Sequence, residues 1–147
     1  HPVRSFPEDG LKLISNPGLF WSLAFAIRRC TFEQIGGFDE SFTGYGGEDT
    51  DFGFAARAAG CPLYFLGGAV ACHQHHETFD PPLQHLEDII ANAKHFWRKW
   101  GVWPMRGWLE QFVQLGLIEW QSDSVRQIRA PRDDERANAL SNWPSES

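Results

Sequence analysis

Two adjacent acidic residues, Glu48 and Asp49, follow a glycine-rich stretch and are well placed to do acid–base chemistry. A carboxylate can accept a proton from a substrate hydroxyl, and neighbouring glycines let a substrate approach the backbone closely. We therefore predict that Asp49 is a general base. The alternative is that both acids only occupy the first turn of a helix, where the positive end of the helix dipole favours them.

Three histidines within four residues, His73, His75 and His76, form a second candidate group. Imidazole is a good ligand for divalent first-row metal ions, and the end of a predicted strand at residues 69–72 would hold His73 rigidly. We expect His73 to bind a metal ion. His75 and His76 are further ligands, partners that orient a ligand, or ordinary loop histidines.

Three motifs in a fixed order resemble a known enzyme family. Residues 35–42 read I-G-G-F-D-E-S-F, residues 46–51 read G-G-E-D-T-D, and His73 lies about two dozen residues further on. This combination resembles GT-A glycosyltransferases, specifically the C-terminal region shared by family 2 enzymes, β-1,4-galactosyltransferases and polypeptide GalNAc-transferases. The resemblance covers residues 20–76.

The resemblance implies a role for each of several residues. Asp49 would face the acceptor hydroxyl, and Glu48 would hold the acceptor or neighbouring groups in place. His73 would complete a Mn²⁺ or Mg²⁺ site begun by a D-x-D motif, and that ion would neutralise the leaving diphosphate of a nucleotide sugar. Tyr45 stands where galactosyltransferases carry Trp, so it is a candidate platform for a sugar. Its alternative role is to anchor the loop.

Three further residues are assigned to acceptor or donor binding. Gly46 and Gly47 directly precede the acids, and Trp21 is a candidate to line the acceptor cleft. Trp21 belongs to an apolar run at residues 20–27 that we expect to be a buried strand, and aromatic residues in strands are more often core residues. The core is therefore the alternative reading of Trp21.

Residues 49–51 spell D-T-D, but their context does not fit a nucleotide–metal motif. A true D-x-D ends an apolar strand, whereas this one begins a helix after a glycine-rich loop. Only about 19 residues precede the first matched segment, so we expect the βαβ nucleotide-binding half to be missing. Ser-Leu at residues 22–23 and Ala55 replace the Gly-Gly and Arg of the families, which bears on donor and acceptor more than on reaction type.

Hydrophobic spacing and turn residues predict the elements that position these side chains. The expected strands span residues 11–14, 20–27, 63–66 and 69–72. The expected helices are a short one with a capping box at residues 31–34, one at residues 48–59 that stops at Gly60, one at residues 86–100 that stops at Gly101, and one from Pro104 to Gly116.

These elements predict an α/β fold, namely the C-terminal half of a GT-A (nucleotide-diphospho-sugar transferase) fold with a helical C-terminal extension. We divide the chain into an acceptor-side subdomain at residues 1–80, a helical extension at residues 81–121 and a polar tail at residues 122–147. The extension resembles one seen in bacterial family 2 members. Hydrophobic residues thin out in the last segment, so we expect a solvated helix or tail there.

Composition argues against several other classes. A net charge of -6 and a pI near 5.4 disfavour nucleic-acid or anionic-membrane partners, because both attract a basic excess. The longest apolar run, at residues 19–27, is well short of the roughly 20 residues that a membrane span needs. Three cysteines without C-x-x-C spacing indicate reduced thiols and a cytoplasmic protein.

We therefore predict an inverting, metal-dependent glycosyltransferase that moves a galactose-like sugar from a nucleotide-sugar donor to a carbohydrate or glycoconjugate hydroxyl. Without the nucleotide-binding half, this chain alone is expected to be inactive and to form homo-oligomers through an uncovered sheet face. The alternative is a carbohydrate-binding or interaction module without catalysis. A small metal hydrolase built on the three histidines and Asp49 is disfavoured, because no H-E-x-x-H spacing supports it.

Overall fold

The computed structural model describes residues 6–72, 74 and 77–141. These residues divide into two compact units, each of which is described by itself. The first comprises residues 6–41 and 48–72, and the second comprises residues 42–47, 74 and 77–141. Both contain helices and small antiparallel sheets. The expected mixture of helices and strands is confirmed, whereas the assignment to one half of a GT-A fold with a helical extension stays a prediction.

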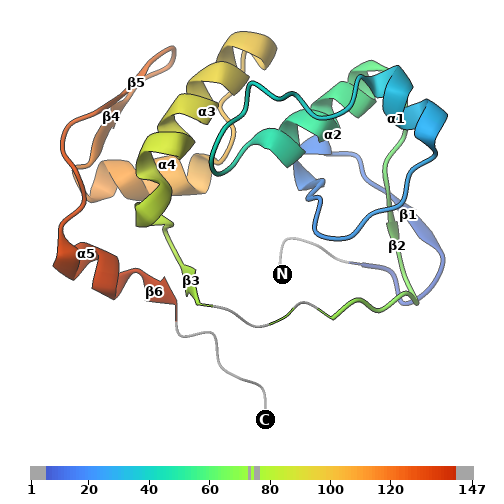
Figure 1. The fold of residues 1–147 in the computed structure, drawn as a ribbon, viewed down its shortest axis with the longest axis horizontal. Helices are drawn as coiled ribbons and strands as arrows, with labels where there is room; N and C mark the ends of the chain where they lie inside the picture. Colours follow the sequence, from blue (N-terminus) through green and yellow to red (C-terminus); the bar gives the residue numbers. More distant parts are fainter. Residues whose placement is uncertain (1–5, 73, 75–76, 142–147) are drawn as a thin grey trace. The chain divides into compact units, whose positions relative to one another are not determined.

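The first unit packs around Phe52, a fully buried side chain of helix α2 (Glu48–Ala58). The rings of Phe20, Phe25, Phe32 and Phe38 lie between 4.7 and 6.2 Å from that of Phe52, and we call these five residues the aromatic cluster. The other elements of the unit are β1 (Leu11–Leu13), η1 (Pro17–Leu19), α1 (Arg29–Ile35) and β2 (Tyr64–Leu66), and β1 is antiparallel to β2 (Figure 1).

Two expected strands and one expected helix cap are wrong. Residues 20–27 form no strand, and neither do residues 69–72. The apolar side chains of the first segment instead supply rings to the aromatic cluster, and a strand without a neighbouring strand would leave its backbone groups unpaired. Helix α1 begins at Arg29, so Thr31 lies inside the helix and is not its cap.

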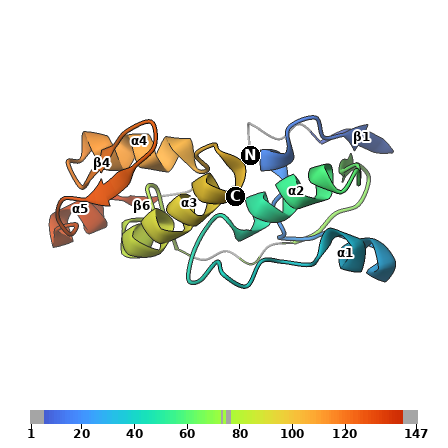
Figure 2. The ribbon, with the colours of Figure 1, turned by 90° about the horizontal axis from the view of Figure 1, so that it is seen from above.

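The second unit packs helices α3 (Leu86–Trp100) and α4 (Arg106–Gln114) with a hairpin of β4 (Ile118–Trp120) and β5 (Val125–Gln127) (Figures 1 and 2). Helix α3 confirms the helix expected from apolar spacing. It ends at Gly101, whose φ of 68° is the left-handed conformation typical of a C-terminal glycine. The shared core contains Leu86, Ile89, Ile90 and Ala93 of α3, Leu109 and Phe112 of α4, and Leu117, Ile118 and Val125.

Short elements complete the second unit. They are β3 (Thr78–Phe79), η2 (Leu83–His85), α5 (Asp133–Asn138) and β6 (Leu140–Ser141), and β3 is antiparallel to β6. Helix α4 begins at Arg106 after Met105, so Pro104 is not its first residue, contrary to our expectation. No helix in the described ranges is both long and apolar enough to cross a membrane.

The segment that we expected to be a solvated tail contributes to this core as far as Ala139, which is 6% exposed. Glu135 fastens α5, because its carboxylate accepts two bonds from the Arg129 guanidinium at 2.6 and 2.8 Å and one from the backbone N–H of Arg132 at 2.8 Å. These bonds lower the pKa of Glu135 to about 2. A charge pair and few apolar side chains therefore order a segment with little hydrophobic pattern. The division of the chain at residues 80 and 121 stays a prediction.

Candidate functional site

The two predicted catalytic acids, Glu48 and Asp49, lie in the first turn of α2, as expected. Both residues are partly buried. One carboxylate oxygen of Asp49 accepts the backbone N–H of Thr50 at 2.7 Å, and the Thr50 hydroxyl lies 3.5 Å from the same oxygen. The helix start thus holds the Asp49 carboxylate in a defined orientation, which a proton acceptor needs. Their catalytic roles stay a prediction.

A third acid of this turn, Asp51, lies in the interior of the first unit. It is 1% exposed and directly precedes Phe52, at the centre of the aromatic cluster. Gly53 lies so close to η1 that an added Cβ would clash with the carbonyl oxygen of Pro17. The buried side of α2 is therefore pressed onto η1, and Asp49 is the more accessible acid of the D-T-D sequence. We did not foresee the burial of Asp51, whose only sequence signal is its place beside an apolar helix face.

Residues 42–47, which we call the Gly-rich loop, belong to the second unit and need glycine at three positions. Gly44, Gly46 and Gly47 have φ values of 69°, 92° and 97°, the left-handed region that side chains disfavour. A Cβ on Gly46 would lie 2.8 Å from the sulfur of Met105, and one on Gly47 would lie 3.2 Å from the ring of Phe42. The conformation of this loop therefore depends on glycine at these three positions.

Asn92 of α3 holds this loop in place. Its side-chain nitrogen donates to the carbonyl oxygens of Gly46 at 2.8 Å, Thr43 at 2.9 Å and Tyr45 at 3.3 Å, and its side-chain oxygen accepts the Thr43 N–H at 3.3 Å. Asn92 is only 3% exposed. Sequence reasoning missed it, although a polar residue within the apolar face of a predicted helix is a signal that such a bond is needed.

Tyr45 projects from the loop onto other aromatic residues of the second unit. Its ring stacks on His85 with a centroid distance of 4.2 Å and an interplanar angle of 9°, and Trp108 lies 5.9 Å away. The side chain is still 42% exposed. Tyr45 is therefore both anchored and accessible, so the structure is compatible with both roles considered above, and its contact with a sugar stays a prediction.

Trp21 is exposed to solvent, whereas its neighbour Phe20 is buried. Phe20 is 8% exposed and belongs to the aromatic cluster, whereas Trp21 is 40% exposed in an irregular segment. Phe20 is therefore a core residue, and Trp21 is not. The proposed place of Trp21 beside an acceptor stays a prediction.

The predicted metal ligand His73 lies outside the described residues, as do His75 and His76. Among residues 6–72, 74 and 77–141, no group of three or more His, Cys, Asp or Glu side chains is arranged to hold a metal ion. Metal binding by His73 therefore stays a prediction.

Comparison with known families places the candidate acids inside a recognised segment. Residues 13–77 match the family model described as the N-terminal domain of galactosyltransferase. This segment contains Trp21, Tyr45 and the Glu48-Asp49 pair. The resemblance to glycosyltransferases is thus confirmed. The description names an N-terminal domain, so our placement of the segment in the C-terminal half of the enzyme stays a prediction.

Curated relatives are also glycosyltransferases or synthases by name. The chain is 32% identical over 80 residues to validoxylamine A glucosyltransferase of Streptomyces hygroscopicus subsp. jinggangensis (strain 5008). The aligned residues make up 54% of this chain and 18% of that protein. It is also 42% identical over 90 residues to chondroitin synthase of Escherichia coli, and these residues make up 59% of this chain and 12% of that protein. The chain therefore spans less than a fifth of either relative. No solved structure matches the chain significantly.

Proposed function

Because residues 13–77 form a glycosyltransferase-like region, we propose that the chain is part of an enzyme that transfers a sugar from a nucleotide-sugar donor to a hydroxyl of a carbohydrate or glycoconjugate. The observation that carries this proposal is the position of Asp49. It lies in the matched segment, in the first turn of α2, and is partly exposed, whereas Asp51 of the same turn is buried. A partly exposed carboxylate with a fixed orientation suits a proton acceptor.

In the proposed reaction Asp49 is the general base. The acceptor oxygen attacks the anomeric carbon of the donor, its proton moves to the Asp49 carboxylate, and the bond between the anomeric carbon and the diphosphate breaks. A single displacement of this kind inverts the anomeric configuration. Glu48, beside Asp49 in the same turn, would hold the acceptor by accepting hydrogen bonds from its hydroxyl groups.

In the second unit, Tyr45 would offer its exposed ring to a sugar. Aromatic rings pack against the C–H face of sugars, and a platform works best when its own conformation is fixed. Tyr45 meets this condition, because His85 stacks on its ring and Asn92 bonds its carbonyl oxygen at 3.3 Å. Gly46 and Gly47 would leave space for the ligand beside the backbone. We keep Trp21 as a further acceptor contact of the first unit.

We further propose a divalent ion, Mn²⁺ or Mg²⁺, with His73 among its ligands. Bound to the donor diphosphate, such an ion supplies charge neutralisation for the leaving group. The proposal rests on the position of His73 after the G-G-E-D motif alone, because the histidine lies outside the described residues. In the longer parent protein, His73→Ala should raise the Mn²⁺ concentration needed for half-maximal activity more than His75→Ala does. The reverse order would move the ligand to His75.

We also propose which sugar the donor carries and where in the cell the enzyme acts. The description of the family model favours a galactose-like sugar, and the name of the Streptomyces relative makes glucose the second donor to test. We propose that a nucleotide-binding half outside this chain completes the enzyme. All three cysteines are free, which supports our proposal of a reducing, cytoplasmic location.

The function is tested by a transfer assay on the longer parent protein. Purified parent protein would be incubated with Mn²⁺, a set of nucleotide sugars that includes UDP-galactose and UDP-glucose, and neutral and acidic oligosaccharide acceptors. We expect sugar transfer by the parent and none by the 147-residue chain alone. A parent protein that binds oligosaccharides but neither transfers nor hydrolyses any donor would favour a carbohydrate-binding module instead.

A further inference from the structure

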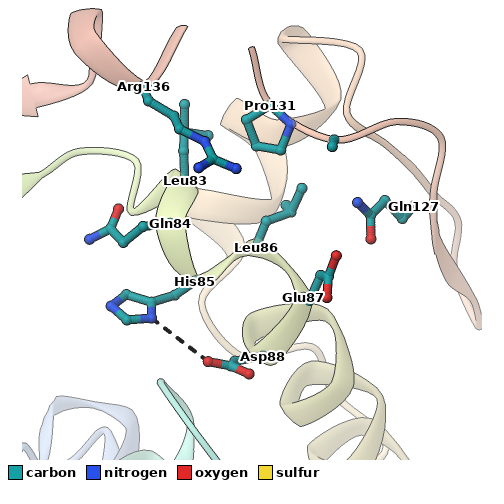
Figure 3. Close-up of a pocket in the computed structure, with 10 residues that line it drawn as sticks. Leu83, Gln84, His85, Leu86, Glu87, Asp88, Gln127, Pro131 and Arg136 are labelled. Atoms are coloured by element: carbon teal, nitrogen blue, oxygen red, sulfur yellow. Dashed lines mark ion pairs between the residues drawn. The ribbon is translucent and has the colours of Figure 1, made fainter. Parts of the chain in front are cut away.

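The second unit contains a pocket outside the segment matched by the galactosyltransferase model. Its volume is about 160 Å³, and three stretches of chain form its wall (Figure 3). These are residues 83–88 of η2 and the start of α3, Gln127 at the end of β5 with Ala130 and Pro131 after it, and Arg136 of α5. We call it the α3 pocket. All of its lining residues belong to the second unit.

The wall of the α3 pocket is mostly polar and offers both hydrogen-bond acceptors and donors. Figure 3 shows the carboxylates of Glu87 and Asp88, the guanidinium group of Arg136 and the amide of Gln127 around it. The Asp88 carboxylate lies 3.7 Å from Nδ1 of His85. Typical pockets for drug-like ligands are mostly apolar, so this wall favours a ligand rich in hydroxyl groups.

Size and charge narrow the ligand further. The volume of about 160 Å³ is well below the roughly 300 Å³ at which pockets for drug-sized ligands begin, so the pocket accepts one sugar ring at most. The wall carries two carboxylates, Glu87 and Asp88, against one permanent cation, Arg136. An anionic ligand would meet net repulsion there, whereas hydroxyl groups can donate to the carboxylates and accept from the guanidinium group.

His85 links this pocket to the predicted sugar platform. His85 is one of the residues that line the α3 pocket, and its imidazole ring stacks on Tyr45 at 4.2 Å. We propose that the α3 pocket binds one neutral pyranose ring of the acceptor, next to the sugar that contacts Tyr45. This inference rests on the proposed function, and it deepens that function by making the preferred acceptor longer than a single sugar.

The direct test is binding of simple glycosides to the 147-residue chain, followed by NMR. The probes are methyl β-D-glucopyranoside, methyl β-D-galactopyranoside and, as the anionic counterpart, methyl β-D-glucuronide. At least one neutral glycoside should bind with a dissociation constant on the order of 1 mM, as expected for a small ligand in a polar pocket, and should shift the resonances of His85. The glucuronide should bind more weakly. Absence of neutral binding, or equal binding of the glucuronide, would overturn the proposal.

Matched variants locate the binding. Glu87→Gln and Arg136→Ala remove pocket groups, and each should weaken binding about fivefold or more, since a hydrogen bond to a charged group is lost. Glu110→Gln and Arg98→Ala change exposed helix residues outside the pocket wall and should leave binding unchanged. Circular dichroism should show that all four variants fold. Equal affinity of the pocket variants and the wild type would place the ligand elsewhere and overturn the assignment.

Kinetics of the parent protein separate this proposal from the proposed function. With a disaccharide acceptor, Glu87→Gln should raise the acceptor KM and leave kcat almost unchanged. With a monosaccharide acceptor, the same variant should behave like the wild type. Transfer by a parent protein whose α3 pocket binds no glycoside would reject only the pocket proposal. Glycoside binding by a parent protein that transfers no sugar would reject the transferase, and with it the acceptor role of the pocket, and would leave only a sugar-binding site.

Discussion

The side-chain amide of Asn92, in the middle of α3, donates to the carbonyl oxygen of Gly46 at 2.8 Å across 46 residues of sequence. It donates to two further loop carbonyl oxygens, and its side chain is almost fully buried. The conformation of the Gly-rich loop therefore depends on one residue of a distant helix. This relationship ties the position of Tyr45, the predicted sugar platform, to the core of the second unit.

Asn92→Ala should destabilise the second unit, because loop carbonyl groups lose their donors in a buried place. We expect the free energy of unfolding to fall by about 1–3 kcal/mol in urea denaturation. Asn138→Ala, which changes an exposed residue of α5, is the matched control and should change it little. An Asn92→Ala variant as stable as the control would show that the loop does not need this clamp.

Gly46→Ala should also destabilise the protein. An alanine at this position would have to adopt a φ of 92°, and its Cβ would lie 2.8 Å from the sulfur of Met105. The backbone conformation alone costs roughly 1–2 kcal/mol. Gly107→Ala is the control, because that glycine lies in α4 with no atom near an added Cβ, and alanine there should be neutral or stabilising. Thermal unfolding of the two variants would be compared, and equal melting temperatures would contradict the assigned strain.

Acid should weaken the attachment of α5. The pKa of Glu135 is lowered from 4.5 to about 2 in the folded protein, first of all by its bonds to Arg129. A lowered folded-state pKa contributes stability that is present above pH 4.5 and is lost as pH falls towards 2. Glu135→Gln should therefore unfold more easily than the wild type at neutral pH, and the difference should shrink on acidification.

The control for this pH experiment is Glu110→Gln, an exposed carboxylate of α4. Its melting temperature should follow that of the wild type at every pH. If the difference in melting temperature between Glu135→Gln and the wild type stays constant down to pH about 2, the ion pair of Glu135 with Arg129 is not the source of the acid sensitivity.

The two strands of the first unit carry an exposed apolar face that should cause self-association. Leu11 pairs with Leu66 and Leu13 with Tyr64, so all four side chains lie on one face of the sheet, and they are 68%, 53%, 59% and 48% exposed. We expect the 147-residue chain to form homo-oligomers in sedimentation velocity, and Leu13→Ser with Leu66→Ser to shift it towards monomer. Val113→Ser, which changes an exposed residue of α4, should not shift it. A monomeric wild type at the highest soluble concentration would contradict this prediction.

The sequence predicted the elements with strong local patterns. Helix α3 has apolar residues at helical spacing and a terminal glycine, and α2 begins with acids and stops before Gly60. The strand predicted at residues 20–27 was wrong, because a continuous apolar run does not distinguish a strand from an irregular segment that fills a core with aromatic rings. The strand order could not be derived, since β1 pairs with a strand about 50 residues away.

The candidate site was predictable in part. The positions of Glu48 and Asp49 at a helix start, after a glycine-rich loop, followed from residue types. The clamp by Asn92 and the stack of Tyr45 on His85 did not, because both depend on how distant segments pack. Likewise, the bonds of Arg129 to Glu135, which hold α5 in the described part of this segment, are not revealed by composition.

In the proposed reaction Asp49 accepts the proton of the acceptor hydroxyl, and the most direct test of this role is the kinetics of Asp49→Asn in the longer parent protein. The amide keeps the shape of the side chain but cannot accept the proton. Turnover should fall at least about 100-fold while donor affinity, measured by calorimetry, stays nearly the same. Glu33→Gln, an exposed residue of α1 in the same unit, should retain full turnover. Turnover of Asp49→Asn within about threefold of the wild type would contradict the role of Asp49 as the general base.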